Sequence, residues 1–343
     1  MSRESRNRSL REIMDRRGVG ALLLTSPANF AWYTGGADNR VDRGDPAGVA
    51  SVLLTGDDAF ILTDNIEAPR MHEEQTPGME IVEHPWHEEP AALLRELTGD
   101  VGLGTDLPAG SGLNLSAEIA PLRYVLDDEA IRDYRRLGAD TVLAVSEVAD
   151  SLTPETDELE AAAELSAACL GRGMFTPVLL AASKERLVRY RHPIPQGGPL
   201  GRQAMLVACA ERGGLFANTT QMVYFDEPDP ETLGRQEICT EILRRMREEA
   251  TRPGHTIAQA FEDCRRFYAE AGFRGGWKHH HQGGMTGYAS REVIASSEAQ
   301  QEISEGQAFA WNPSLVGAKA EETFVLGPDG PKVLTRSRDG AFD

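Results

Sequence analysis

The stretch that most constrains this chain is residues 278–292, KHHHQGGMTGYASRE, where three consecutive histidines precede three glycines and an Arg-Glu pair. Histidine has the side-chain pKa nearest to neutral pH, so three together indicate a metal site or acid–base chemistry. The glycines allow the backbone to approach a ligand closely. A purification tag would lie at a terminus, whereas this run is internal, and an exposed polar turn is the remaining alternative.

Composition excludes several classes of partner. The 343 residues are enough for two domains, and the net charge is −19 without any basic run, which argues against nucleic acid and anionic membrane surfaces. No apolar run approaches the roughly 18 residues that span a bilayer, and the polar first residues do not resemble a signal peptide. Four widely spaced cysteines without a CxxC pair indicate free thiols, so we expect a cytoplasmic protein.

Hydrophobic patterns predict an α/β (α+β) chain. In the first domain, residues 1–122, short apolar runs alternate with helical segments, which is typical of an α/β layer. The second domain, residues 123–343, begins with acidic residues ahead of a long amphipathic helix. The helices predicted in it are 129–150, 157–170, 231–249 and 256–271, and the strands are 178–182, 205–209, 221–225, 308–311 and 323–326.

Two further motifs lie at opposite ends of the chain, SPANFAWYTGG at residues 26–36 and AWNPSLVGAKAEET at residues 310–323. Together with residues 278–292 they resemble the creatinase/prolidase/methionine aminopeptidase superfamily, the pita-bread fold. His280 and Glu292 match the first His and the last Glu of a prolidase-like segment HRLGHGLGLEVHE. The resemblance covers nearly the whole chain in the right order. It implies a creatinase-like N-terminal domain, residues 1–122, and a C-terminal pita-bread domain, residues 123–343.

The departures from the family pattern concern metal binding. Peptidases of this family hold two divalent metal ions with two Asp, one His and two Glu. In this chain the matching positions hold Val207 or Ala208, Asn218, Gly284, Asn312 and Glu321. Only Glu321 keeps a residue type that binds metal in the family. One carboxylate and two neutral amides cannot hold two such ions. We therefore expect no metal and no other cofactor, as in creatinase, a metal-free member.

The resemblance also implies roles for individual residues in the pocket. His192 matches the acid–base histidine of creatinase, although a histidine before a proline is also an ordinary loop residue. Glu321 is expected to face the pocket and hold a cationic or NH-rich group, while Glu322 points away because neighbours on a strand alternate. Arg291 replaces the family's second active-site His with a fixed cation. The other expected pocket residues are His280, His281, Asn218 and Asn312.

A polar loop at residues 36–44 carries two arginines. It has the character of a solvated surface loop. In creatinase, however, the matching loop brings an Arg to the active site of the neighbouring subunit, and Arg43 takes that place here, with Arg40 as the second candidate. The planar guanidinium suits a substrate carboxylate because it makes two parallel hydrogen bonds. The resemblance therefore implies a homodimer with a shared active site.

These features favour a metal-independent, creatinase-like hydrolase of a C–N bond in a small amidine, cyclic amidine or amide. One alternative is a metal-dependent Xaa-Pro aminopeptidase or dipeptidase, and another is a catalytically inactive pseudo-peptidase that binds a ligand. A new metal site within residues 279–281 is a further alternative, although adjacent residues rarely converge on one ion. The sequence leaves open the substrate and whether His192 or His280 is the base.

Overall fold

The structure is a computed structural model, and it describes residues 2–56, 58–99, 101–108 and 112–336. The chain divides into two compact units, Met1–Arg123 and Tyr124–Asp343. Sequence patterns place the boundary after residue 122. Each unit has its own sheets and its own buried core, so each is described by itself.

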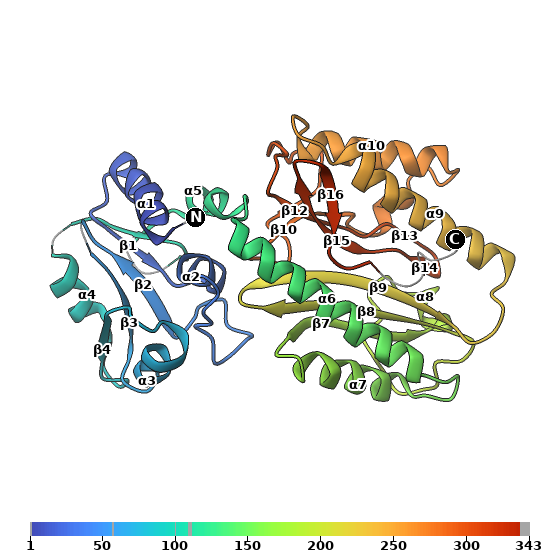
Figure 1. The fold of residues 1–343 in the computed structure, drawn as a ribbon, viewed down its shortest axis with the longest axis horizontal. Coiled ribbons are helices and arrows are strands. Elements are labelled where there is room, and N and C mark those ends of the chain that lie inside the picture. The colour runs from blue at the N-terminus through green and yellow to red at the C-terminus, as the bar shows by residue number, and fades with distance from the viewer. Residues whose placement is uncertain (1, 57, 100, 109–111, 337–343) are drawn as a thin grey trace. The chain divides into compact units, whose positions relative to one another are not determined.

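The first unit is an α/β layer on a mixed six-stranded sheet with the order β4-β3-β2-β1-β5-β6 (Figure 1). Strand β1 is antiparallel to β2 and parallel to β5. The strands are β1 (Ala21–Leu24), β2 (Ala50–Leu54), β3 (Ala59–Asp64), β4 (Ile81–His84), β5 (Leu103–Thr105) and β6 (Leu113–Asn114). The helices are α1 (Arg3–Arg17), α2 (Pro27–Thr34), α3 (Ala68–Arg70), α4 (Ala91–Thr98) and α5 (Ser116–Ile119).

The second unit contains two successive groups of helices and strands. The first group has helices α6 (Asp128–Ser151), α7 (Glu158–Leu170) and α8 (Lys184–Leu187), and the antiparallel strands β7 (Phe175–Ser183), β8 (Gln203–Arg212) and β9 (Leu215–Tyr224). Helix α6 packs on β8 and β9, and α7 packs on β7 (Figure 1). Asp127 caps α6 because its side chain accepts a hydrogen bond from the Ala130 amide.

The second group contains helices α9 (Pro230–Arg245) and α10 (Ile257–Glu270), with a π-helical turn, Met246–Ala250, between them. A five-stranded sheet follows, with the order β11-β10-β12-β15-β16. Its strands are β10 (Gly283–Thr286), β11 (Val293–Ile294), β12 (Ala308–Trp311), β15 (Glu322–Gly327) and β16 (Gly330–Val333), beside the short pair β13 (Ser314–Leu315) and β14 (Ala318–Lys319). Fully buried Phe309, Trp311 and Phe324 stack in the core.

Strand pairing brings distant motifs of the second unit together. In the β8–β9 hairpin Cys209 lies opposite Asn218, so these two side chains share one face of the sheet. Strand β9 also contacts β15, where the Asn218 amide donates a 2.8 Å hydrogen bond to Thr323 Oγ1. The hairpin and the start of β15 therefore border one common space, which contains the candidate site.

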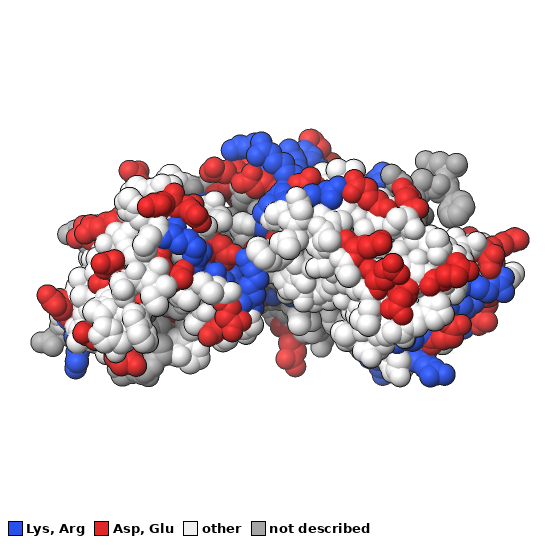
Figure 2. Space-filling model, turned by 90° about the horizontal axis from the view of Figure 1, so that it is seen from below, with Lys and Arg blue, Asp and Glu red and all other residues white. Residues whose placement is uncertain are grey.

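Charged side chains occur on both units on the face shown in Figure 2. On the face shown in Figure 2, Asp and Glu side chains are spread widely, with Lys and Arg in smaller groups among them. Among the described residues, no helix combines the length and apolar character that crossing a bilayer requires.

Candidate functional site

A cavity of about 110 Å³ in the second unit gathers most of the predicted site residues. A single water needs about 10–15 Å³ by this measure, so the cavity has room for roughly seven to eleven water-sized groups. Its lining residues come from strands β7, β8, β9 and β14 and from loops. They are Val178, Leu180, His192, Val207, Cys209, Asn218, His281, Ser290, Arg291, Asn312, Lys319 and Glu321. The predicted residue His280 lies next to this lining, in contact with His192.

The contacts of His192 and His280 define their proton positions. His280 Nε2 lies 2.9 Å from His192 Nε2, and His280 Nδ1 makes a short contact with the His281 carbonyl oxygen. A carbonyl oxygen only accepts, so His280 Nδ1 carries a proton and His280 Nε2 accepts one from His192 Nε2–H. The remaining nitrogen of His192, Nδ1, therefore keeps its lone pair and is the basic atom of this pair.

The surroundings keep all three histidines uncharged near neutral pH. Burial, aided by Lys319, lowers the pKa of His280 to about 3. Burial and Arg291 lower the pKa of His281 to about 4. The pKa of the more exposed His192 is also lowered, first by burial and then by Lys319. A neutral imidazole can accept a proton, so His192 is competent as a base at pH 7.

The same three histidines form a group with metal-ligand geometry. Nitrogen atoms of His192, His280 and His281 lie within 4.8 Å of one another, the one such group among the described parts of the chain. Imidazole is a common ligand of transition metals. The sequence pattern indicated His279, His280 and His281 as possible metal ligands. In the structure His279 is exposed and not part of the group, and its third member is His192, from a loop distant in sequence. Lys319 and Arg291 are both close enough to lower histidine pKa values here, and both repel a metal cation.

Glu321 is buried in an ion-pair cluster. Its Oε2 accepts hydrogen bonds from Lys319 Nζ at 2.7 Å and Thr220 Oγ1 at 2.8 Å, and its Oε1 faces Arg291 Nη2 at 3.3 Å. Burial acts to raise the pKa of this carboxyl, but Lys319 and Arg291 outweigh it and bring the pKa to about 2. Glu321 is therefore ionised, and both of its oxygens already have cationic partners. The expected role of holding a cationic substrate group does not agree with this geometry.

Lys319 is a site residue that sequence analysis missed. It lies two positions before Glu321, and the signal was this spacing, because residues i and i+2 on an extended chain share one face. Gln236 holds the Lys319 backbone on both sides, donating from Nε2 to the Lys319 carbonyl at 3.0 Å and accepting at Oε1 from its amide at 3.2 Å. Other lining residues that were missed are Val178, Leu180, Cys209 and Ser290. The neighbouring Glu322 is buried in a separate ion pair with Arg247 and does not line the cavity.

Three polar atoms at the cavity are buried without a hydrogen-bond partner. They are Asn218 Nδ2, Asn312 Oδ1 and Arg291 Nε. Asn218 and Asn312 are only 4% and 2% exposed. A buried polar atom without a partner typically costs about 1–3 kcal/mol, so such atoms indicate a place for a polar ligand. The set contains two donors and one acceptor.

The residues present do not fit the two metal ions of the family's peptidases. Val207, which lines the cavity, offers only an aliphatic side chain, while Ala208 is on the opposite face of β8. Gly284 leaves no room for the family's ligand histidine, since its φ is 145° and a Cβ there would lie 2.1 Å from the Val293 carbonyl oxygen. Glu321 is already neutralised by Lys319. Two unit charges of like sign about 4 Å apart repel by about 4 kcal/mol near a protein surface, and a dication would feel twice that.

The two arginines of the predicted intersubunit loop pair with one acid in the first unit. Arg40 Nε donates to Asp38 Oδ1 at 2.8 Å, and Arg43 makes a short ion pair with Asp38 Oδ2. Both cations lower the pKa of Asp38 against the opposing effect of burial. Both guanidinium groups therefore have a local carboxylate partner, and the shared-site role of Arg43 remains a prediction.

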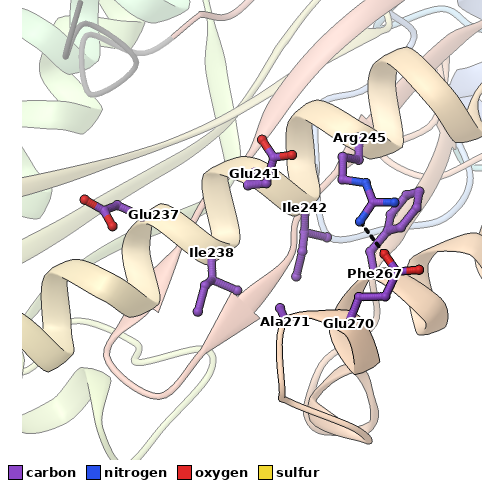
Figure 3. Close-up of a pocket in the computed structure, with 8 residues that line it drawn as sticks. All are labelled: Glu237, Ile238, Glu241, Ile242, Arg245, Phe267, Glu270 and Ala271. Carbon is purple, nitrogen blue, oxygen red and sulfur yellow. Dashed lines mark hydrogen bonds and ion pairs between the residues drawn. The ribbon is translucent and has the colours of Figure 1, made fainter.

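A larger cavity, of about 370 Å³, lies between helices α9 and α10 (Figure 3). Ile238, Ile242 and Phe267 form its apolar part, and Arg245 lies over the Phe267 ring at 3.7 Å. Arg245 also pairs with Glu270, as the dashed line in Figure 3 shows. This cavity lacks histidines and buried unpartnered polar atoms among its lining residues, so it does not compete as the reaction site.

Comparison with known families agrees with the two units. The Creatinase/Prolidase N-terminal domain matches residues 6–135, and Metallopeptidase family M24 matches residues 132–328. No curated protein sequence matches the chain.

Solved structures share the fold at low sequence identity. The prolidase from Pyrococcus horikoshii OT3 is 18% identical, with a TM-score of 0.83 over 97% of this chain and 99% of that chain. The Xaa-Pro dipeptidase from Bacillus anthracis is also 18% identical, with a TM-score of 0.81 over 98% of each chain. The X-Pro aminopeptidase from Thermotoga maritima MSB8 has 18% identity and a TM-score of 0.77 over 96% and 97%.

These matches confirm the predicted fold, an N-terminal creatinase-like α/β domain followed by a C-terminal pita-bread domain. The M24 profile alone covers more than half of the 343 residues. The chain therefore belongs to metallopeptidase family M24.

Proposed function

We propose that the cavity of the second unit is the active site of a hydrolase that cleaves a C–N bond in a small polar substrate without a dinuclear metal centre. The observation that supports this proposal is the Lys319–Glu321–Arg291 cluster, because Glu321, the one acid at a position that matches a family metal ligand, already pairs with two cations. The residue equivalent to the ligand histidine is Gly284, which has no space for a side chain. The family's fold is thus retained while its metal chemistry is replaced.

His192 supplies the acid–base chemistry in this proposal. Its Nδ1 accepts a proton from a water molecule, and the water oxygen forms a new bond to the substrate carbon as the C–N bond breaks. The same proton then passes to the leaving nitrogen, so His192 returns to its neutral state. His280 orients the ring, because its Nε2 accepts the proton on His192 Nε2 and leaves Nδ1 free.

The size of the cavity limits the substrate. Room for roughly seven to eleven water-sized groups suits an amide, an amidine or a cyclic amidine. A panel of such compounds, together with Xaa-Pro dipeptides, would identify ligands by thermal shift, because a ligand that binds the folded state raises the midpoint of unfolding.

The test of this proposal is His192→Asn, compared with His279→Asn as the matched control. Asn retains hydrogen bonding but cannot take up a proton, so the kcat of the His192 variant should fall by about 10²–10⁴ while ligand binding persists. His279 is exposed and does not line the cavity, so its variant should retain wild-type kcat. Wild-type kcat in His192→Asn would refute the proposal.

A second candidate is a metal-dependent Xaa-Pro peptidase. Membership of family M24 supports it, and the solved neighbours include a prolidase and an Xaa-Pro dipeptidase. His192, His280 and His281 are the only grouped nitrogen ligands among the described residues. This candidate requires a stoichiometric transition metal in the purified protein and Xaa-Pro cleavage that a chelator abolishes. Elemental analysis showing less than a tenth of an equivalent of metal in an active preparation would exclude it.

A further inference from the structure

We infer that Lys319 is the principal anion-binding group of the cavity, a fixed ammonium in the electrostatic place of the family's metal ions, and that it binds the carboxylate of a small monocarboxylic acid. This inference deepens the proposed function by naming a substrate class, and its catalytic meaning rests on that function. The family resemblance assigns no role to Lys319.

The charges around the cavity leave an excess of one positive charge. Lys319 and Arg291 contribute two cations, and Glu321 contributes one anion. The three nearby histidines are neutral because burial lowers the pKa of each. The other lining residues are uncharged, and they include the buried thiol of Cys209, whose pKa burial raises to about 12. A single bound carboxylate would balance the site.

The hydrogen-bonding groups match the same ligand. The ammonium of Lys319 has three protons, and the structure gives it one acceptor, Glu321 Oε2. Arg291 Nε and Asn218 Nδ2 are buried donors without partners. A carboxylate accepts several hydrogen bonds on two oxygens and can serve these donors. Asn312 Oδ1 is a buried acceptor without a partner, so the ligand also carries an N–H or O–H group.

The cation is held in place before any ligand arrives. The Lys319 side chain is 6% exposed, so water does not screen it as it would a surface lysine. Gln236 fixes its backbone through two hydrogen bonds, and Glu321 fixes its ammonium. A buried, preorganised charge binds an anion more strongly than a flexible surface charge does, because less conformational entropy is lost.

The experiment measures ligand binding by the chelator-treated full-length protein, by calorimetry and thermal shift. The probes are glycolate and acetate as monocarboxylates, acetamide as the uncharged analogue of acetate, and Zn²⁺ and Mn²⁺ as metals. We expect the monocarboxylates to bind, with glycolate tighter because its hydroxyl can donate to Asn312. We expect acetamide to bind at least about tenfold more weakly, since it lacks the charge that Lys319 recognises.

The variants are Lys319→Met, Lys319→Arg and the control Lys332→Met. Met removes the charge but keeps most of the length, and it leaves Glu321 paired with Arg291. Its affinity for glycolate should fall at least about tenfold, and Arg should restore part of the loss. Lys332 is a half-exposed lysine on β16 outside the cavity, so its variant should bind as the wild type does. Circular dichroism on each variant establishes that it is folded.

Three results would overturn the inference. They are equal glycolate affinity in folded Lys319→Met and wild type, equal affinity for acetate and acetamide, or one equivalent of Zn²⁺ that is lost in His281→Ala and retained in His279→Ala. Lys319-dependent glycolate binding without turnover of any amide or amidine would support the inference while refuting the proposed hydrolase. The two ideas therefore fail separately.

Discussion

The neutral His280 imidazole should make the folded protein sensitive to mild acid. His280 is 8% exposed, and burial, with Lys319, His281 and His192 beside it, lowers its pKa to about 3. In the unfolded chain a histidine has a pKa of about 6.5. As the pH falls below about 6.5, the unfolded state binds a proton that the folded state does not, so the free energy of unfolding decreases.

The size of this effect follows from the difference in pKa. At pH 7 both states are mostly neutral at His280, whereas at pH 5 the unfolded state is protonated and the folded state is not. Each pH unit in this window is equivalent to about 1.4 kcal/mol, so the interval of about 1.5 units between 6.5 and 5 gives about 2 kcal/mol. His280→Gln cannot titrate, and it should lose about 2 kcal/mol less than the wild type between pH 7 and pH 5.

The assay is urea unfolding at both pH values for the wild type, His280→Gln and His279→Gln. The difference between pH 7 and pH 5 within each protein removes the constant effect of each substitution. His279 is exposed next to the site, so His279→Gln should lose as much stability as the wild type does. Equal losses in the wild type and His280→Gln would show that His280 carries the same proton in both states, which would refute the reasoning.

Three further predictions concern Gly284, the proposed base His192 and the oligomeric state. Gly284→Ala should lower the free energy of unfolding by about 2–6 kcal/mol through backbone strain and steric overlap. In the same urea assay the control Gly287→Ala should change it by less than about 1 kcal/mol, because a Cβ at Gly287 would have no neighbour nearer than 3.6 Å. Burial and Lys319 lower the pKa of His192, so kcat should stay level down to about pH 6.5 and fall below it. Lys319→Met should move this fall in kcat to higher pH. The same pH profile of kcat in Lys319→Met and wild type would show that Lys319 does not lower the pKa of the catalytic base. If the chain is a homodimer in which Arg43 reaches the neighbouring subunit's site, light scattering should give a dimer and Arg43→Ala should raise KM while leaving kcat within about threefold. A monomer at micromolar concentration would refute the shared-site role of Arg43.

Much of the architecture was readable from the order of local motifs. The helix at 129–150, for example, appears as α6, Asp128–Ser151, since its cap and its apolar spacing are local properties. The helix predicted at 231–249 is instead α9 followed by the π-helical turn Met246–Ala250. A change of hydrogen-bonding pattern inside a continuous helix leaves the hydrophobic pattern unchanged, so the sequence does not reveal it.

The sequence by itself determined the family, and it predicted the departures at the expected metal-ligand positions, because Asn218, Gly284 and Asn312 are read from the motifs directly. Only the tertiary structure decided which charged and basic side chains surround these positions. Folding brings Lys319 Nζ into a hydrogen bond with Glu321, and it brings His192 into contact with His280, which is 88 positions away in the sequence. Charge balance and proton position depend on the distances between such remote groups and on their burial, and these quantities exist only once the strands and loops of the second unit have packed together.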